Sequence, residues 1–101
     1  GFYEAAKAAR RSPPGENGRG ANEIVYLLQS IEFADRTYVG LTDDLRTRIA
    51  DHNKGRSPHT DKHKPWRLVS YIAFSDARKA IAFERYLKSA SGRAFANKRL
   101  R

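Results

Sequence analysis

The chain has 101 residues, enough for one small domain with a single hydrophobic core. Lys and Arg outnumber Asp and Glu by 20 to 11, and the resulting net charge of +9 favours a polyanionic partner such as nucleic acid. The lack of cysteine excludes disulfides and thiolate chemistry, and no apolar run is long enough for a transmembrane helix. We therefore expect a folded, cytoplasmic domain.

The first 22 residues differ in character from the rest. The stretch 12–20 is rich in Pro and Gly, a composition typical of a linker. We interpret residues 1–22 as a flexible arm or linker and residues 23–101 as the folded domain. The alternative for 1–22 is a helix that docks over a sheet edge.

Two strands are predicted at the start of the domain. Residues 24–29 form an apolar run of β-branched and aromatic residues, which indicates a buried strand, and residues 36–41 form a second strand. A hairpin centred near Glu32 would place Tyr26 opposite Tyr38 or close to it.

The remaining elements alternate between helix and strand. Thr42 and Asp43 supply a cap for a helix that Gly55 ends, and a polar, basic loop follows over residues 56–65. We then expect a strand over 66–73 and a helix that begins at Ser75 or Asp76 and ends at about 88–89. A break at 91–93 separates this helix from a last helical turn or two over 94–100. The order ββαβα plus a C-terminal helix predicts an α+β fold with a small three-stranded mixed or antiparallel sheet.

Both main helices place charged or titratable residues on their apolar stripes. The first stripe consists of Leu45, Arg48, Ile49 and His52, and the second of Ala77, Ala80, Ile81, Glu84 and Leu87. Charges that face a core are costly unless they are paired, bind a metal or line a cleft. A basic and an acidic inward face therefore predict a shared polar site.

Together these residues resemble the GIY-YIG nuclease superfamily, and in particular its small stand-alone bacterial members. The second family motif matches well at Tyr38-Val39-Gly40, whereas the first matches at 24–26 only through Tyr26 and lacks its glycine. The resemblance extends over about residues 23–97, and it covers the positions of the family's catalytic arginine, helical histidine and metal-binding glutamate at Arg48, His52 and Glu84.

The resemblance implies a set of site residues. The catalytic residues would be Tyr26, Tyr38, Arg48, His52 and Glu84, with Glu84 as the ligand of one Mg²⁺ or Mn²⁺ ion; substrate would be bound by Gly40, Arg48, Lys88, Arg93 and Asn97. Mg²⁺ takes only one or two protein carboxylates beside waters and phosphates, so a lone glutamate suffices. We expect Arg48 to hold the phosphate, and we favour Tyr38 as the group that activates water, with Tyr26 positioning it.

Each residue also has a purely structural interpretation. A strand tyrosine is usually a core residue, Arg48 and Glu84 could simply pair with one another, and His52 could cap a helix C-terminus. The joint pattern favours a metal-dependent DNA endonuclease of low sequence specificity, acting as a monomer and preferring single-stranded or branched DNA. The alternatives are a non-catalytic nucleic-acid-binding module that keeps the fold and a basic structural protein of a ribonucleoprotein.

Overall fold

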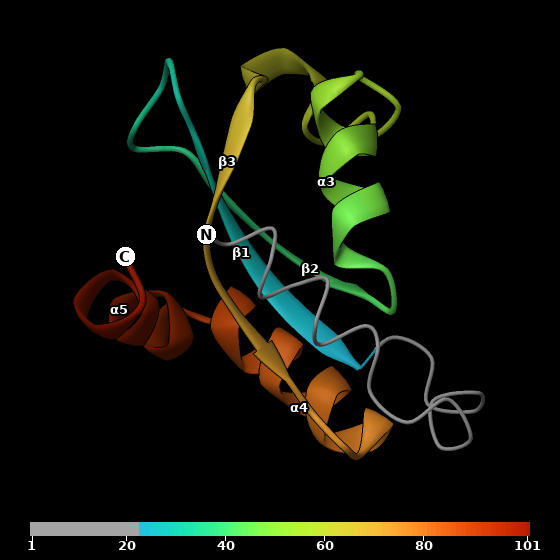
Figure 1. The fold of residues 1–101 in the computed structure, drawn as a ribbon. Coiled ribbons are helices and arrows are strands. Elements are labelled where there is room, and N and C mark those ends of the chain that lie inside the picture. The colour runs from blue at the N-terminus through green and yellow to red at the C-terminus, as the bar shows by residue number, and fades with distance from the viewer. Residues whose placement is uncertain (1–22) are drawn as a thin grey trace.

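The computed structural model describes residues 23–101, so the interpretation of residues 1–22 lies outside the described part. The elements are β1 (Ile24–Ser30), β2 (Thr37–Thr42), α3 (Leu45–Asn53), the short 3₁₀ helix η1 (Asp61–His63), β3 (Trp66–Ala73), α4 (Ala77–Lys88) and α5 (Ala90–Arg99) (Figure 1). The predicted α+β class and element order are confirmed.

The three strands form one antiparallel sheet in the order β2-β1-β3. The central strand β1 is buried along almost its whole length, because helices cover both faces of the sheet. Successive side chains of a strand point to opposite faces. Tyr26 and Leu28 therefore face α3, whereas Val25 and Leu27 face α4 and α5.

The predicted register of the first hairpin is wrong by two residues. Tyr26 pairs with Gly40, and Tyr38 pairs with Leu28. The connection is shifted because Ser30 bonds to the chain beyond it: its amide donates to the Arg36 carbonyl at 3.0 Å, and its hydroxyl accepts from the Phe33 amide. A shift of two residues leaves both tyrosines on the expected face of the sheet.

Helix α3 packs one residue per turn into the core. Leu45, Ile49 and His52 are buried, as the stripe predicted, and Arg48 is half-buried at its edge. The cap is Asp44 and not Thr42 or Asp43, since the Asp44 carboxylate accepts from the Thr47 amide. The positive φ of 78° at Gly55 explains why the helix ends just before it.

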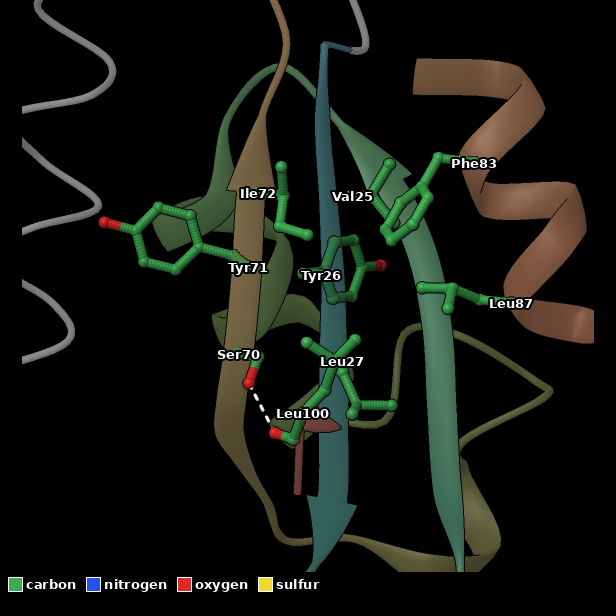
Figure 2. Close-up of a pocket in the computed structure, with 9 residues that line it drawn as sticks. All are labelled: Val25, Tyr26, Leu27, Ser70, Tyr71, Ile72, Phe83, Leu87 and Leu100. Carbon is green, nitrogen blue, oxygen red and sulfur yellow. Dashed lines mark hydrogen bonds between the residues drawn. The ribbon is translucent and has the colours of Figure 1, made fainter. Parts of the chain in front are cut away.

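On the other face of the sheet, α4 and α5 cover an apolar layer that includes Val25, Leu27 and Leu87 (Figure 2). Ile81 was expected on the inward stripe of α4, but it is exposed, because Phe83 instead packs toward the sheet. The Ser70 hydroxyl donates to the Leu100 carbonyl at 2.5 Å, which ties the end of α5 to β3.

The break between the two C-terminal helices lies at Ser89, two residues before the predicted position. Ser89 ends α4 and also caps α5, accepting from the Gly92 amide at 3.1 Å. Gly92 lies inside α5, where a Cβ atom would overlap with the Tyr86 backbone carbonyl. Gly92 therefore permits the close approach of α5 to the end of α4 and does not end a helix. None of the helices in residues 23–101 has the length and apolar character needed to cross a membrane.

Candidate functional site

The centre of the candidate site is Tyr26, in the middle strand of the sheet. Its ring lies over Gly40 of the edge strand β2, where a Cβ atom would overlap with the phenol ring and its hydroxyl. Figure 2 shows the Tyr26 hydroxyl directed toward β2. On this face, Gly40 makes room for Tyr26 and not for a substrate backbone, so its expected substrate-binding role stays a prediction.

His52 on α3 meets the Tyr26 hydroxyl directly. The Tyr26 oxygen lies 2.8 Å from His52 Nε2, and the two side chains are only 1% and 0% exposed. Tyr38 completes the cluster: its ring centroid is 4.9 Å from that of His52 and 6.3 Å from that of Tyr26. The structure therefore brings both predicted tyrosines to the predicted histidine, but only Tyr26 is hydrogen-bonded to it.

Arg48, one turn before His52, lies beside the Tyr26 phenol, and its interaction with the phenol raises the Arg48 pKa above its ordinary value. The guanidinium therefore stays charged. Its neighbour Arg46 is exposed, as expected for the outer face of α3. Arg48 thus presents a fixed positive charge at the edge of an otherwise buried cluster.

The protonation states follow from burial. Burial raises the pKa of Tyr26 to about 12, although the interaction with the nearby Arg48 cation opposes the shift. Burial, with the positive charge of Arg48 as a smaller cause, lowers the pKa of His52 to about 4. At neutral pH the site therefore holds a neutral phenol, a neutral imidazole and a cationic guanidinium.

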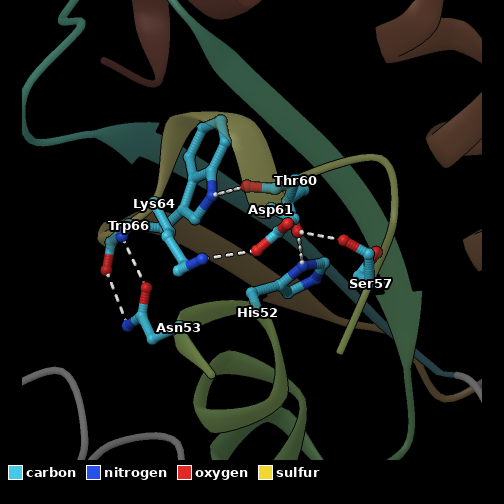
Figure 3. Close-up of polar contacts among 7 residues, drawn as sticks. All are labelled: His52, Asn53, Ser57, Thr60, Asp61, Lys64 and Trp66. Atoms are coloured by element: carbon cyan, nitrogen blue, oxygen red, sulfur yellow. Dashed lines mark hydrogen bonds and ion pairs between the residues drawn. The ribbon is translucent and has the colours of Figure 1, made fainter. Parts of the chain in front are cut away.

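The loop after α3 supports His52 from behind through contacts that the sequence did not predict (Figure 3). His52 Nδ1 lies 2.7 Å from the Thr60 hydroxyl oxygen, and the Trp66 indole donates to the Thr60 carbonyl at 2.9 Å. Asn53 accepts from the Trp66 amide at 2.6 Å and donates to its carbonyl at 3.1 Å. The only sequence signal was a set of polar residues at irregular spacing, which fixes no contact.

Two histidines of this loop lie outside the cluster. His59 is exposed, in agreement with its place in a polar, lysine-rich segment. His63 is half-buried, because its ring packs edge-on against Phe33 and Trp66. Neither is within a group of metal-ligating residues in the described part of the chain.

Glu84 approaches the cluster from α4. Its negative charge is among the influences that raise the Tyr26 pKa, which places the carboxylate within electrostatic reach of the phenol. The side chain is 15% exposed, and its Oε2 atom lies 2.5 Å from Lys88 Nζ. Among the described residues its ion-pair partner is Lys88 and not Arg48, so the structural pairing of Arg48 with Glu84 is not observed.

A divalent ion at this site would have few protein ligands. Residues 23–101 contain no group of three or more His, Cys, Asp or Glu side chains that could hold an ion. A Mg²⁺ site built from one carboxylate, waters and a substrate phosphate needs no such group. Glu84 fits that description, since its carboxylate is partly exposed and already attracts the Lys88 cation.

Two other predicted substrate-binding residues lie on α5. Arg93 and Asn97 are exposed on α5, and Asn97 accepts a hydrogen bond from Arg101 at 2.9 Å. In the described part of the chain no hydrogen bond or ion pair joins either residue to Tyr26, His52 or Glu84. Their role in binding substrate therefore stays a prediction.

Acid should destabilise the fold through His52. Its pKa is about 4 in the folded chain and 6.5 ordinarily, so between these values the unfolded chain takes up a proton that the folded chain does not. The associated stability is fully present above about pH 6.5 and is lost as the pH falls toward 4, by on the order of 3 kcal/mol. Urea unfolding from pH 7 to pH 4 measures this loss. The His52→Gln variant lacks the titrating ring, so its free energy of unfolding should fall less between pH 7 and pH 4, by about that amount. Equal losses in the two proteins would contradict the assignment of a buried, neutral His52.

Comparisons with known proteins agree with this geometry. The family model of the GIY-YIG catalytic domain matches residues 22–99. A UPF0213 protein of Pediococcus acidilactici is 30% identical over 82 residues, covering 77% of this chain and 76% of that protein. No solved structure matches the chain significantly.

Two further relatives match a smaller part of the chain. A UPF0213 protein of Lacticaseibacillus paracasei is 38% identical over 52 residues, which are 50% of this chain and 58% of that protein. A structure-specific endonuclease subunit SLX1 homolog of Giardia intestinalis is 35% identical over 60 residues, which are 55% of this chain but 17% of that protein. The chain thus spans little more than half of the first relative and a small part of the second. With the family model matched along nearly the whole described domain, the chain belongs to the GIY-YIG catalytic domain family.

Proposed function

We propose that this chain is a divalent-metal-dependent DNA endonuclease that hydrolyses phosphodiester bonds with low sequence specificity. Membership of the GIY-YIG family supports a nuclease-type function. The observation that carries the proposal is the buried hydrogen bond between Tyr26 and His52, with the Arg48 cation beside the same phenol. In this arrangement a proton acceptor, His52, a hydroxyl that can relay a proton, Tyr26, and a cation that can bind phosphate, Arg48, lie next to one another.

The direction of the Tyr26–His52 hydrogen bond follows from what each partner can donate. Arg48 has only N–H donors, so it cannot take the phenolic proton. The positive charge of Arg48 beside the phenol also favours an O–H that points away from the guanidinium, so the Tyr26 O–H donates to His52 Nε2. Because the phenol pKa is about 12, Tyr26 does not ionise at neutral pH.

Water activation then proceeds by relay. The attacking water gives a proton to the Tyr26 oxygen as the phenolic proton passes to His52 Nε2, so the tyrosine stays neutral throughout. This assigns the activating role to Tyr26, in place of Tyr38, on the strength of the hydrogen bond that only Tyr26 makes to His52. Tyr38, packed edge-on against His52, would then border the space where water and phosphate meet.

The charges around the relay suit a phosphate diester. Arg48 would hold the scissile phosphate through its planar guanidinium, which matches phosphate oxygens in a bidentate manner. Glu84 would hold one Mg²⁺ or Mn²⁺ ion after its ion pair with Lys88 opens. Such an ion neutralises charge that develops on the phosphoryl group and on the departing 3′-oxygen. Lys88, released from Glu84, would be free to contact a neighbouring phosphate.

The substrate class is inferred from charge and from one relative. A net charge of +9 favours nucleic acid. The Giardia relative is named a subunit of a structure-specific endonuclease. We therefore propose branched or single-stranded DNA as the first substrates to test, against duplex DNA and RNA of equal length.

The competing function is a module that binds nucleic acid without cutting it. This alternative requires no cation at Glu84 and no relay, because phosphate contacts alone provide affinity. The buried pairing of Tyr26 with His52 argues against it, since a phenol and an imidazole of that arrangement add nothing to surface binding of DNA.

A matched pair of arginine variants tests the proposal. Arg48→Ala should lower the cleavage rate by about 10²–10³-fold, the scale for losing one main electrostatic stabiliser. Arg46→Ala removes the same charge from the exposed side of the same helix and should cost much less. Rates are measured on labelled branched, single-stranded and duplex DNA with Mg²⁺ or with a chelator. Equal losses at the two positions, or binding without any metal-dependent cutting by the parent protein, would contradict the proposal.

A further inference from the structure

We propose that Thr60 is a positioning residue that fixes the tautomer of His52, so that the unprotonated Nε2 atom faces Tyr26. The inference deepens the proposed function and rests on it for its catalytic consequence. The tautomer itself can be measured without any cleavage assay.

The geometry is a continuous buried chain from Tyr26 to the loop before β3, and Figure 3 shows its part from His52 through Thr60 to Ser57. The Tyr26 oxygen is 2.8 Å from His52 Nε2, His52 Nδ1 is 2.7 Å from the Thr60 hydroxyl, and that hydroxyl is 3.5 Å from the Ser57 carbonyl oxygen. His52 and Thr60 are both 0% exposed, so neither finds a substitute partner in bulk solvent.

The proton positions along this series of hydrogen bonds follow from its Tyr26 end. The Tyr26 hydroxyl donates to Nε2, because the Arg48 cation beside the phenol has only N–H donors and cannot accept the phenolic proton. A neutral imidazole with an unprotonated Nε2 carries its proton on Nδ1, which therefore donates to Thr60 Oγ1. The Thr60 hydroxyl proton is then directed to the Ser57 carbonyl, the remaining acceptor in reach.

Thr60 is itself held from several sides. Its amide donates to the Ser57 carbonyl at 3.1 Å, and its carbonyl accepts from the Trp66 indole at 2.9 Å. Trp66 is in turn anchored to the end of α3 by the two hydrogen bonds with Asn53. The Thr60 hydroxyl is thereby fixed relative to the helix that carries His52, which is the requirement for setting a ring orientation.

Removing the Thr60 hydroxyl tests this role. Thr60→Val keeps the branched shape but leaves Nδ1–H without its acceptor, so His52 should shift toward the Nε2–H tautomer, which cannot accept the Tyr26 proton. Thr60→Ser keeps the hydroxyl and is the matched control. The ¹⁵N chemical shifts of the His52 ring, measured by NMR on the whole chain at pH 7, distinguish the two tautomers.

The expected result is Nδ1–H in the parent and in Thr60→Ser, and a large Nε2–H fraction in Thr60→Val. The turnover number of Thr60→Val should fall by on the order of 10–100-fold, the range seen when the partner that orients a metal-ligating histidine is removed. The KM of Thr60→Val should change little. The Thr60→Ser variant should keep both its turnover number and its KM close to the parental values. An Nε2–H tautomer in the parent chain would overturn the inference even if Thr60→Val does not fold. Equal loss of turnover in the valine and serine variants would also overturn it, as would an unchanged tautomer in Thr60→Val. Absence of cleavage in all three proteins, with the tautomers as expected, would instead count against the proposed function.

Discussion

A Glu84→Gln variant is expected to fold and to bind DNA but to lose detectable metal-dependent cleavage. The substitution keeps the size of the side chain and removes the α4 carboxylate whose charge reaches Tyr26. A neutral amide is a much poorer ligand for Mg²⁺ than a carboxylate, so the ion that neutralises the phosphoryl charge would no longer be held. Single-turnover cleavage at increasing Mg²⁺ and Mn²⁺ measures the loss.

Stability should change little in this variant, because a partly exposed ion pair between residues four apart on a helix contributes only about 0.3–0.5 kcal/mol. Glu32→Gln is the matched control, since Glu32 is exposed in the connection between β1 and β2. It should cut at the parental rate. Full activity in a well-folded Glu84→Gln protein would refute the assignment of Glu84 as the metal ligand.

Tyr26→Phe should have the next largest effect, a loss of cleavage of about 10²–10⁴-fold, the range for a positioned proton-transfer group. Phenylalanine keeps the ring over Gly40 and removes only the hydroxyl, which bonds to His52 and lies beside Arg48. The loss should appear in turnover with little change in DNA affinity, as expected for an interaction made in the transition state. The buried imidazole loses a partner, so unfolding should become easier by about 1–3 kcal/mol.

Tyr38→Phe is the matched comparison within the same cluster. The Tyr38 ring contacts His52 edge-on, and this contact survives the loss of the hydroxyl. We expect a smaller loss of turnover than in Tyr26→Phe. A larger loss at Tyr38 would restore the sequence-based preference for Tyr38 as the activating residue. Parental rates in both variants would show that neither phenol takes part in proton transfer.

Most of the fold was predictable because its signals are local. The β3 boundaries, the end of α3 before Gly55 and the alternation of Tyr26 and Tyr38 onto one face all follow from periodicity and turn chemistry. The errors occur where a tertiary contact overrides a local rule. The observed hairpin register differs from the predicted one because the Ser30 hydroxyl accepts a hydrogen bond within the turn. The break between α4 and α5 lies earlier than predicted because Ser89 caps the second helix.

The sequence predicted that Tyr26, Tyr38 and His52 come together, but it did not predict the contacts between them. Helical spacing brought Arg48 and His52 to one face of α3, and the structure places both at Tyr26. The partnership of Tyr26 with His52, the filling of the space above Gly40 and the support from Thr60 depend on distances between elements. Such distances arise from packing, and no pattern within one element encodes them.

The central claim is that this site hydrolyses a phosphodiester bond with water when Glu84 holds a divalent ion. Cleavage of a branched DNA in ¹⁸O-labelled water, with mass spectrometry of the products, tests this claim most directly. We expect cuts that require Mg²⁺ or Mn²⁺, 3′-hydroxyl ends, and one ¹⁸O atom on each new 5′-phosphate. Intact DNA under all metal conditions, or cutting that persists in a chelator and in the Glu84→Gln variant, would contradict it.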